Sequence, residues 1–165
     1  MNEENYARIS GWFRKKEKRL LTFILFYKIL PDIVVLAYAG CILYTVISGT
    51  SEQMARIIIV PAVTFLLCTV FRKLINKKRP YEELSINPLI KKEKKGQSFP
   101  SRHMVSAAVI AMTAMYIHPL FGTCMLIIAI LVGVVRPIAG VHYIKDVVAG
   151  FVMGVLCGIA GFFLI

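Results

Sequence analysis

The stretch "MVSAAVIAMTAMYIHPLFGTCMLIIAILVGVV", residues 104–135, contains no Lys, Arg, Asp or Glu in 32 residues. A run of this length predicts two crossings of a hydrocarbon layer ~30 Å thick. His118, Pro119 and Gly122 mark the turn between them. Because a chain in lipid must satisfy its own backbone polar groups, both crossings are expected to be helices.

The whole chain has the composition of a membrane protein. Of its 165 residues 58% are hydrophobic, and the mean hydropathy of +0.70 is too high for a soluble domain of this size. Further charge-free runs cover residues 33–49, 57–71 and 147–165, without the alternation of a barrel. We therefore expect an all-α, polytopic membrane helix bundle of about five spans, at roughly 31–49, 54–75, 100–118, 120–136 and 143–165.

The first nineteen residues differ from the rest. Apolar Tyr6, Ile9, Trp12 and Phe13 recur at helical spacing among basic residues, which is typical of an amphipathic helix at a membrane surface. We expect residues 1–19 to be this interfacial segment and residues 20–165 to be the membrane domain. The charged start predicts no cleavable signal peptide. A sixth span around residues 20–32 is the alternative, although residues 20–49 as one helix measure only ~45 Å.

Cysteines and net charge exclude several classes of function. Cys41, Cys68, Cys124 and Cys157 lie in apolar segments without metal-type spacing, so neither disulfides nor a zinc site is expected. The net charge of +11 would suggest nucleic acid in a soluble protein. Between membrane spans, anionic lipid is the nearer partner.

Polar residues gather at one predicted membrane face. The second span ends at Arg72, the third begins at Pro100, the fourth ends near Arg136 and the fifth begins near His142. Successive helices run in opposite directions, so these ends share one face. The face carries "RKLINKKRP" (72–80), "PSRH" (100–103) and "RPIAGVHYIKD" (136–146).

The middle segment has the features of a phosphate cradle. Pro100 suits a first helical turn, with Ser98 or Phe99 as the cap. The backbone N–H groups of Ser101, Arg102 and His103 would then face a phosphate at the positive end of the helix dipole, and His103 would give a proton to a departing oxygen. A capped helix with an interfacial histidine is the alternative.

The last segment has the spacing of an oriented nucleophile. His142 and Asp146 are four residues apart, so a carboxylate on the same helical face fixes the imidazole and leaves its second nitrogen free to attack. A purely structural His–Asp pair fits equally well. Arg136 would bind phosphate oxygens, whereas Arg72 and Arg79 at a membrane edge could also contact lipid phosphates without catalysis. Gly150, Gly154 and Gly158 form a ridge for close helix packing.

Together the three segments resemble the signature of the type 2 phosphatidic acid phosphatase superfamily, which is related to vanadium haloperoxidases and glucose-6-phosphatase. The signature reads K-x6-R-P, P-S-G-H and S-R-x5-H-x3-D. Here Arg72 replaces the lysine, Arg102 the glycine and Val135 the first serine. All acid–base positions agree, and Arg72 keeps the positive charge.

The resemblance implies a membrane lipid phosphatase that needs no metal or cofactor and forms a phosphohistidine. His142 would attack phosphorus, Asp146 would orient it, and His103 would protonate the leaving oxygen and then activate water. Arg72, Arg79, Ser101, Arg102 and Arg136 would hold the phosphate. Candidate substrates are phosphatidic acid, phosphatidylglycerol phosphate and undecaprenyl diphosphate. A non-catalytic protein that binds anionic lipid or a partner through its basic face is the alternative; a transporter is a third reading.

The side of the membrane is open at this stage. The candidate face carries 19 Lys and Arg, against Arg56 alone opposite, and the positive-inside rule would place it in the cytoplasm. The resemblance implies a cell membrane protein with the site outside. The sequence leaves the oligomeric state open.

Overall fold

Helices make up the regular structure of residues 2–164, which the computed structural model describes, and no strand occurs among them. The prediction of an all-α bundle is confirmed. The elements are α1 (Glu3–Arg14), α2 (Glu17–Ser48), α3 (Ser51–Ile75), α4 (Pro80–Glu83), α5 (Arg102–Ile117), α6 (Pro119–Ile138), α7 (Ile144–Ile159) and the π-helical turn η1 (Ala160–Leu164).

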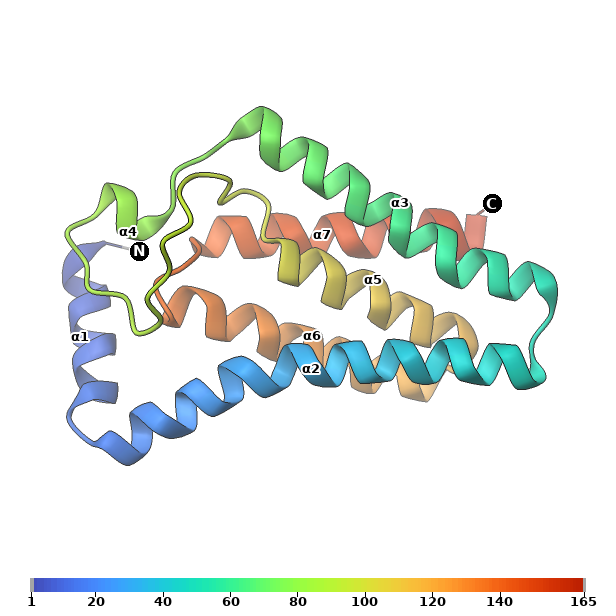
Figure 1. Cartoon of the computed structure of the whole chain (residues 1–165), viewed down its shortest axis with the longest axis horizontal. Helices are drawn as coiled ribbons and strands as arrows, with labels where there is room; N and C mark the ends of the chain where they lie inside the picture. The colour runs from blue at the N-terminus through green and yellow to red at the C-terminus, as the bar shows by residue number, and fades with distance from the viewer. Residues whose placement is uncertain (1, 165) are drawn as a thin grey trace.

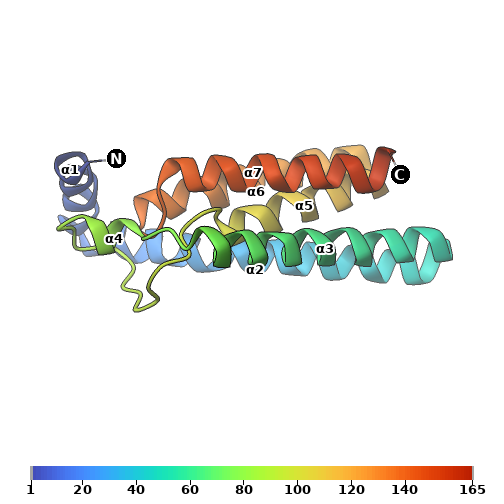
Figure 2. The same ribbon diagram turned by 90° about the horizontal axis from the view of Figure 1, so that it is seen from above.

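Within residues 2–164, four segments are long and apolar enough to cross a membrane: Glu17–Ser48, Ser51–Glu83, Pro119–Ile138 and Ile144–Leu164. The predicted helix at 100–118 is present as α5, but it is shorter. Its 16 residues rise only ~24 Å. Figures 1 and 2 show α5 inside the bundle, and ten of its residues are buried. Protein rather than lipid surrounds it, so it need not match the thickness of the bilayer.

The first span begins earlier than predicted. α2 starts at Glu17 and continues through Pro31 to Ser48, whereas the sequence suggested a start near residue 31. Lys28, Pro31 and Asp32 look like a boundary in the sequence, but proline removes only one backbone hydrogen bond of a long helix. In Figure 1 the helix bends in its first half. Residues 20–32 are therefore part of one long helix, and they form no sixth span.

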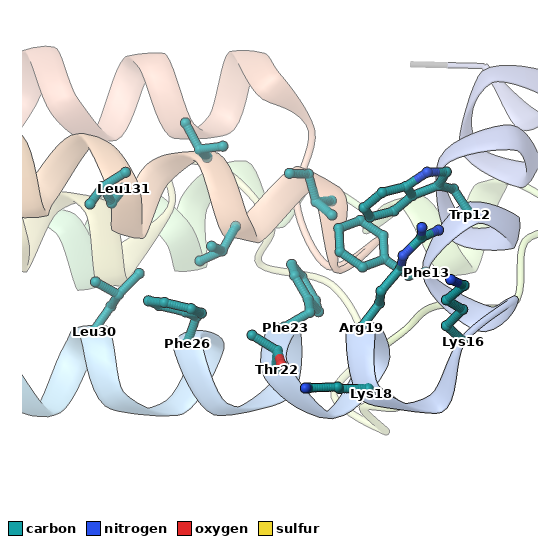
Figure 3. Close-up of a pocket in the computed structure, with 13 residues that line it drawn as sticks. Trp12, Phe13, Lys16, Lys18, Arg19, Thr22, Phe23, Phe26, Leu30 and Leu131 are labelled. Carbon is teal, nitrogen blue, oxygen red and sulfur yellow. The ribbon is translucent and has the colours of Figure 1, made fainter.

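The N-terminal helix α1 lies across the end of the bundle (Figure 1). Tyr6 is buried, and its hydroxyl accepts a hydrogen bond from the Leu89 backbone at 2.9 Å. Between α1, α2 and α6 runs a groove of about 600 Å³, in which Phe13 packs between Trp12 and Phe23 (Figure 3). Lys16, Lys18 and Arg19 also line it. Aromatic and basic side chains in this arrangement suit the predicted surface anchor.

The glycine ridge joins α7 to α5, as predicted. A Cβ at Gly150 would lie 2.8 Å from the Ser101 carbonyl oxygen, and one at Gly154 would lie 2.6 Å from Ala108 Cβ. At Gly158 the obstacle would be Met112. The absence of side chains on this face lets α7 approach the start of α5 closely. This contact positions the two helix ends that carry most of the candidate site.

Candidate active site

The predicted convergence of helix ends is present in the structure. One end of the bundle holds the end of α3, the starts of α5 and α7 and the end of α6 (Figure 1). The segment between α3 and α5 folds over these helix ends. The polar segments named above therefore meet at one end of the bundle. Arg72, Arg79, Arg136 and Asp146 are buried there, whereas Lys73, Lys78 and Lys145 are exposed.

Asp146 is the best-anchored group of the site. Its side chain is 0% exposed. Lys77 Nζ lies 2.7 Å from Oδ1, the Ser98 hydroxyl donates to Oδ2 at 2.5 Å, and the Tyr143 backbone N–H donates to Oδ2 at 3.1 Å. A buried carboxylate needs such partners to remain charged. These contacts fix the orientation of Asp146 at the first turn of α7.

His142 lies just before α7, which begins at Ile144, and not on the helix itself as the spacing suggested. Its Nδ1 is 3.9 Å from Asp146 Oδ2, too far for a direct hydrogen bond. The Ser98 hydroxyl lies between them, 3.4 Å from Nδ1. Nδ1 is thus directed at the serine and carboxylate, and Nε2 is the nitrogen left for a substrate.

The imidazole of His142 is held neutral at physiological pH. Burial lowers its pKa to about 4, Asp146 opposes this shift, and the charges of Arg79 and Arg72 add to it. Only 3% of the residue is exposed. A neutral imidazole keeps the lone pair that a nucleophile requires.

The start of α5 differs from the prediction in its capping residue and in the role of the Ser101 backbone N–H. The capping residue is Ser101, with Pro100 before it, so neither Ser98 nor Phe99 is the cap. The Ser101 N–H donates to the Asp146 carbonyl at 2.9 Å and is not available to a phosphate. Its hydroxyl is buried and has no partner within residues 2–164. Ser101 therefore offers a side-chain donor rather than a backbone one.

Three predicted arginines are buried together at this end. Arg72, Arg79 and Arg136 are 3%, 5% and 1% exposed. Arg72 Nη1 donates to the Pro100 carbonyl, and the Arg136 guanidinium lies 4.2 Å above the ring of Tyr27. Within residues 2–164, none of the three is in an ion pair. Arg72 Nε and two nitrogens of Arg136 lack any partner there.

Hydrogen bonds with Glu82 and Gly96 position Arg79. Its backbone N–H donates to the Glu82 carboxylate at 2.8 Å, which also accepts from the Gly96 N–H at 2.8 Å. The Arg79 Nε in turn donates to the Gly96 carbonyl at 3.1 Å. Gly96 has φ +62°, a conformation that glycine adopts without strain. Both the backbone and the side chain of Arg79 are thereby hydrogen-bonded within the polar loop between α3 and α5.

His103 and Arg102 face a different space. His103 is exposed, and its imidazole lies within electrostatic range of the guanidinium groups of Arg136 and Arg72. Both side chains line a slot of about 290 Å³ between α2, α3 and α5. The Arg102 guanidinium lies 5.1 Å above the Phe65 ring, so its side chain is directed into this slot.

Two residues at the site were not predicted. Ser98 was considered only as a helix cap, and Lys77 only as one of several basic residues before Arg79. Both contact Asp146. A local pattern gives little signal for either, because each reaches Asp146 across more than forty residues of sequence.

Comparison with known families identifies the family of the chain. The model of the PAP2 superfamily matches residues 53–164, which include all the predicted site residues, from Arg72 to Asp146. The chain belongs to the PAP2 superfamily. The family resemblance of the three segments is thus confirmed over more than half of the chain.

Individual relatives share the fold. The chain superimposes on LpxE of Aquifex aeolicus with a TM-score of 0.73, at 24% identity, covering 97% of this chain and 93% of that one. It also matches a PAP2-type phosphatidylglycerolphosphate phosphatase of Bacillus subtilis with a TM-score of 0.65 and 25% identity, over 94% and 81% of the two chains. A Bacillus licheniformis protein, the bacitracin transport permease BcrC, is 30% identical over 122 residues. That match covers 71% of this chain and 59% of BcrC.

Proposed function

We propose that this PAP2 protein hydrolyses the phosphate monoester or diphosphate of a membrane lipid through a phosphohistidine. The observation that carries the proposal is the buried positive charge of Arg72, Arg79 and Arg136 beside His142, which forms no ion pair in the described part of the chain, residues 2–164. Buried charge without a partner is costly. A bound phosphate would supply the missing negative charge and acceptors for the unpartnered Arg72, Arg136 and Ser101 donors.

The reaction begins with attack by His142 Nε2 on phosphorus. Asp146, through Ser98, holds the opposite nitrogen and stabilises the imidazolium that forms. The bond from phosphorus to the lipid oxygen breaks, and His103 gives that oxygen a proton. His103 then takes a proton from water, which attacks the phosphohistidine and releases inorganic phosphate. The charge on the transferring group is stabilised by Arg72, Arg79, Arg136 and the Ser101 hydroxyl. The backbone N–H of Arg102, at the start of α5, is a further donor to this group.

The donor set of the site suits a reaction without a metal ion or cofactor. Within residues 2–164 no three His, Cys, Asp or Glu side chains gather as a metal site would require. The guanidinium groups of the candidate active site provide the positive charge that a metal would otherwise bring to a phosphoryl group. We therefore expect activity in EDTA.

The slot beside His103 supports a lipid substrate. Pro31, Val34 and Val35 of α2 and Phe65 of α3 line it, and Val35 is 63% exposed on the outside of the bundle. An apolar tail would lie there while the phosphate reaches the arginines. Phosphatidic acid, phosphatidylglycerol phosphate and undecaprenyl diphosphate are the substrates to test. We place the site on the outer side of the cell membrane, as the family resemblance implies. A reporter fused after Ile165 would mark the opposite face.

The deciding experiment measures phosphate release from these lipids by the purified protein in detergent and EDTA. We expect release by the wild type and by His118→Ala, a matched control because His118 is exposed at the other end of α5. We expect none from His142→Ala. If wild type and His142→Ala behave alike, the hydrolase assignment is wrong, and binding of anionic lipid by the basic face becomes the better account.

A further inference from the structure

Arg102 stands where the family signature has glycine, and its side chain has no role in the mechanism above. Its guanidinium lies over Phe65, and its Nε is buried without a partner within residues 2–164. With His103 it lines the slot between α2, α3 and α5. Arg102 is therefore a cationic group that lines this slot, apart from the buried Arg72, Arg79 and Arg136.

The surroundings of Arg102 favour an anion. Arg72 and Arg102 are close enough for their charges to repel each other. Apart from Arg102, His103 and Ser106, apolar side chains of α2, α3, α5 and α6 line the slot. The ion pairs within residues 2–164 do not include Arg102. A guanidinium facing an apolar slot beside another arginine gains most from a negatively charged ligand between the two.

We propose that Arg102 binds the phosphate that stays on the lipid, and that the preferred substrate is therefore a lipid diphosphate. This inference rests on the proposed function. His142 attacks the terminal phosphorus, and the bond from that phosphorus to the bridging oxygen breaks. The electron pair stays on the bridging oxygen, which takes a proton from His103. The leaving group is the lipid monophosphate, held by Arg102; water then releases inorganic phosphate from His142.

The position of His103 agrees with this arrangement. His103 follows Arg102 directly and lines the same slot, so the proton donor and the cation lie on the same side of the scissile bond. A lipid monophosphate would place an uncharged carbon chain against Arg102 instead. The guanidinium would then be desolvated with only the Phe65 ring as a partner and no anion, which lowers the affinity for that substrate.

The test compares two substrates with the same chain, farnesyl diphosphate and farnesyl monophosphate, in detergent micelles. We expect wild type to prefer the diphosphate in kcat/KM by at least about 10-fold, because a hydrogen bond to a charged group gives about this factor. Arg102→Gly, which restores the family residue, should reduce that preference by about 10- to 100-fold, and Arg102→Lys should retain most of it. Arg19→Gly is the matched control, because Arg19 also lies over an aromatic ring, at 4.1 Å from that of Trp12.

A binding measurement separates this inference from the proposed function. Farnesyl methylenediphosphonate cannot be hydrolysed, and we expect Arg102→Gly to weaken its binding at least about 10-fold, relative to farnesyl phosphonate. Equal preference in wild type and Arg102→Gly, in both turnover and binding, would overturn the inference and leave the hydrolase intact. Absence of turnover together with Arg102-dependent binding would support the diphosphate site and refute the hydrolase.

Discussion

Replacing Ser98 with alanine tests how Asp146 acts on His142. The Ser98 hydroxyl lies 2.5 Å from Asp146 Oδ2 and 3.4 Å from His142 Nδ1, and the residue is 0% exposed. Asp146 itself is too far from the ring for a direct hydrogen bond. A hydrogen bond to a charged group contributes ~1.5–3 kcal/mol. If it acts wholly on the transition state, its loss lowers kcat by about 10- to 150-fold.

The assay is phosphate release at saturating lipid in EDTA, with KM measured in parallel. We expect kcat to fall in Ser98→Ala while KM changes little, because Ser98 orients the nucleophile and is not among the phosphate-binding residues. Thr113→Ala is the matched control: this hydroxyl is also 0% exposed, but it donates to the Val109 carbonyl within α5. A kcat of Ser98→Ala within about twofold of wild type, or an equal loss in Thr113→Ala, would refute the bridging role.

Three further predictions concern packing, charge and pH. Gly154→Leu should destabilise the fold by ~1–3 kcal/mol and lower Tm, because a Cβ there would lie 2.7 Å from the Val105 carbonyl oxygen. Gly40→Leu should leave Tm unchanged, because a Cβ at Gly40 would have nothing within 4 Å. Equal Tm values for the two variants would contradict the packing role of the glycine ridge. Lys77→Met should lower kcat and Tm by removing the ion pair of buried Asp146, and exposed Lys78→Met should do neither. In a histidine NMR titration, the signal missing in His142→Ala should have a midpoint near pH 4. Since an unfolded histidine titrates at ~6.5, the fold should lose stability as pH falls from there towards 4; a midpoint at 6.5 would contradict the effect of burial.

The sequence predicted the bundle well because lipid permits few alternatives. Charge-free runs gave α3, α5, α6 and the combined α7 and η1 within about three residues, since a helix must cover the hydrocarbon layer. The start of α2 was missed by fourteen residues, because Lys28, Pro31 and Asp32 resemble a boundary while α2 continues through them towards the surface. The short length of α5 was also not predicted: its hydropathy does not show that other helices surround it.

The site was predicted by residue type and spacing, but its contacts were not. The predicted residues lie at one end of the bundle, with Arg72, Arg136, Ser101 and Asp146 all buried. The spacing of His142 and Asp146 suggested a direct contact, whereas Ser98 lies between them. Contacts between distant segments depend on how a loop folds over helix ends, and a periodic pattern carries no information about that.

The most direct test of the central claim is a rapid-quench experiment with a lipid whose terminal phosphate carries a radioactive label. The account predicts that, during turnover, labelled phosphate becomes attached to His142, in a bond stable to alkali and labile to acid, at a rate at least equal to kcat. Turnover with no label on the protein, or with label on another residue, would contradict it.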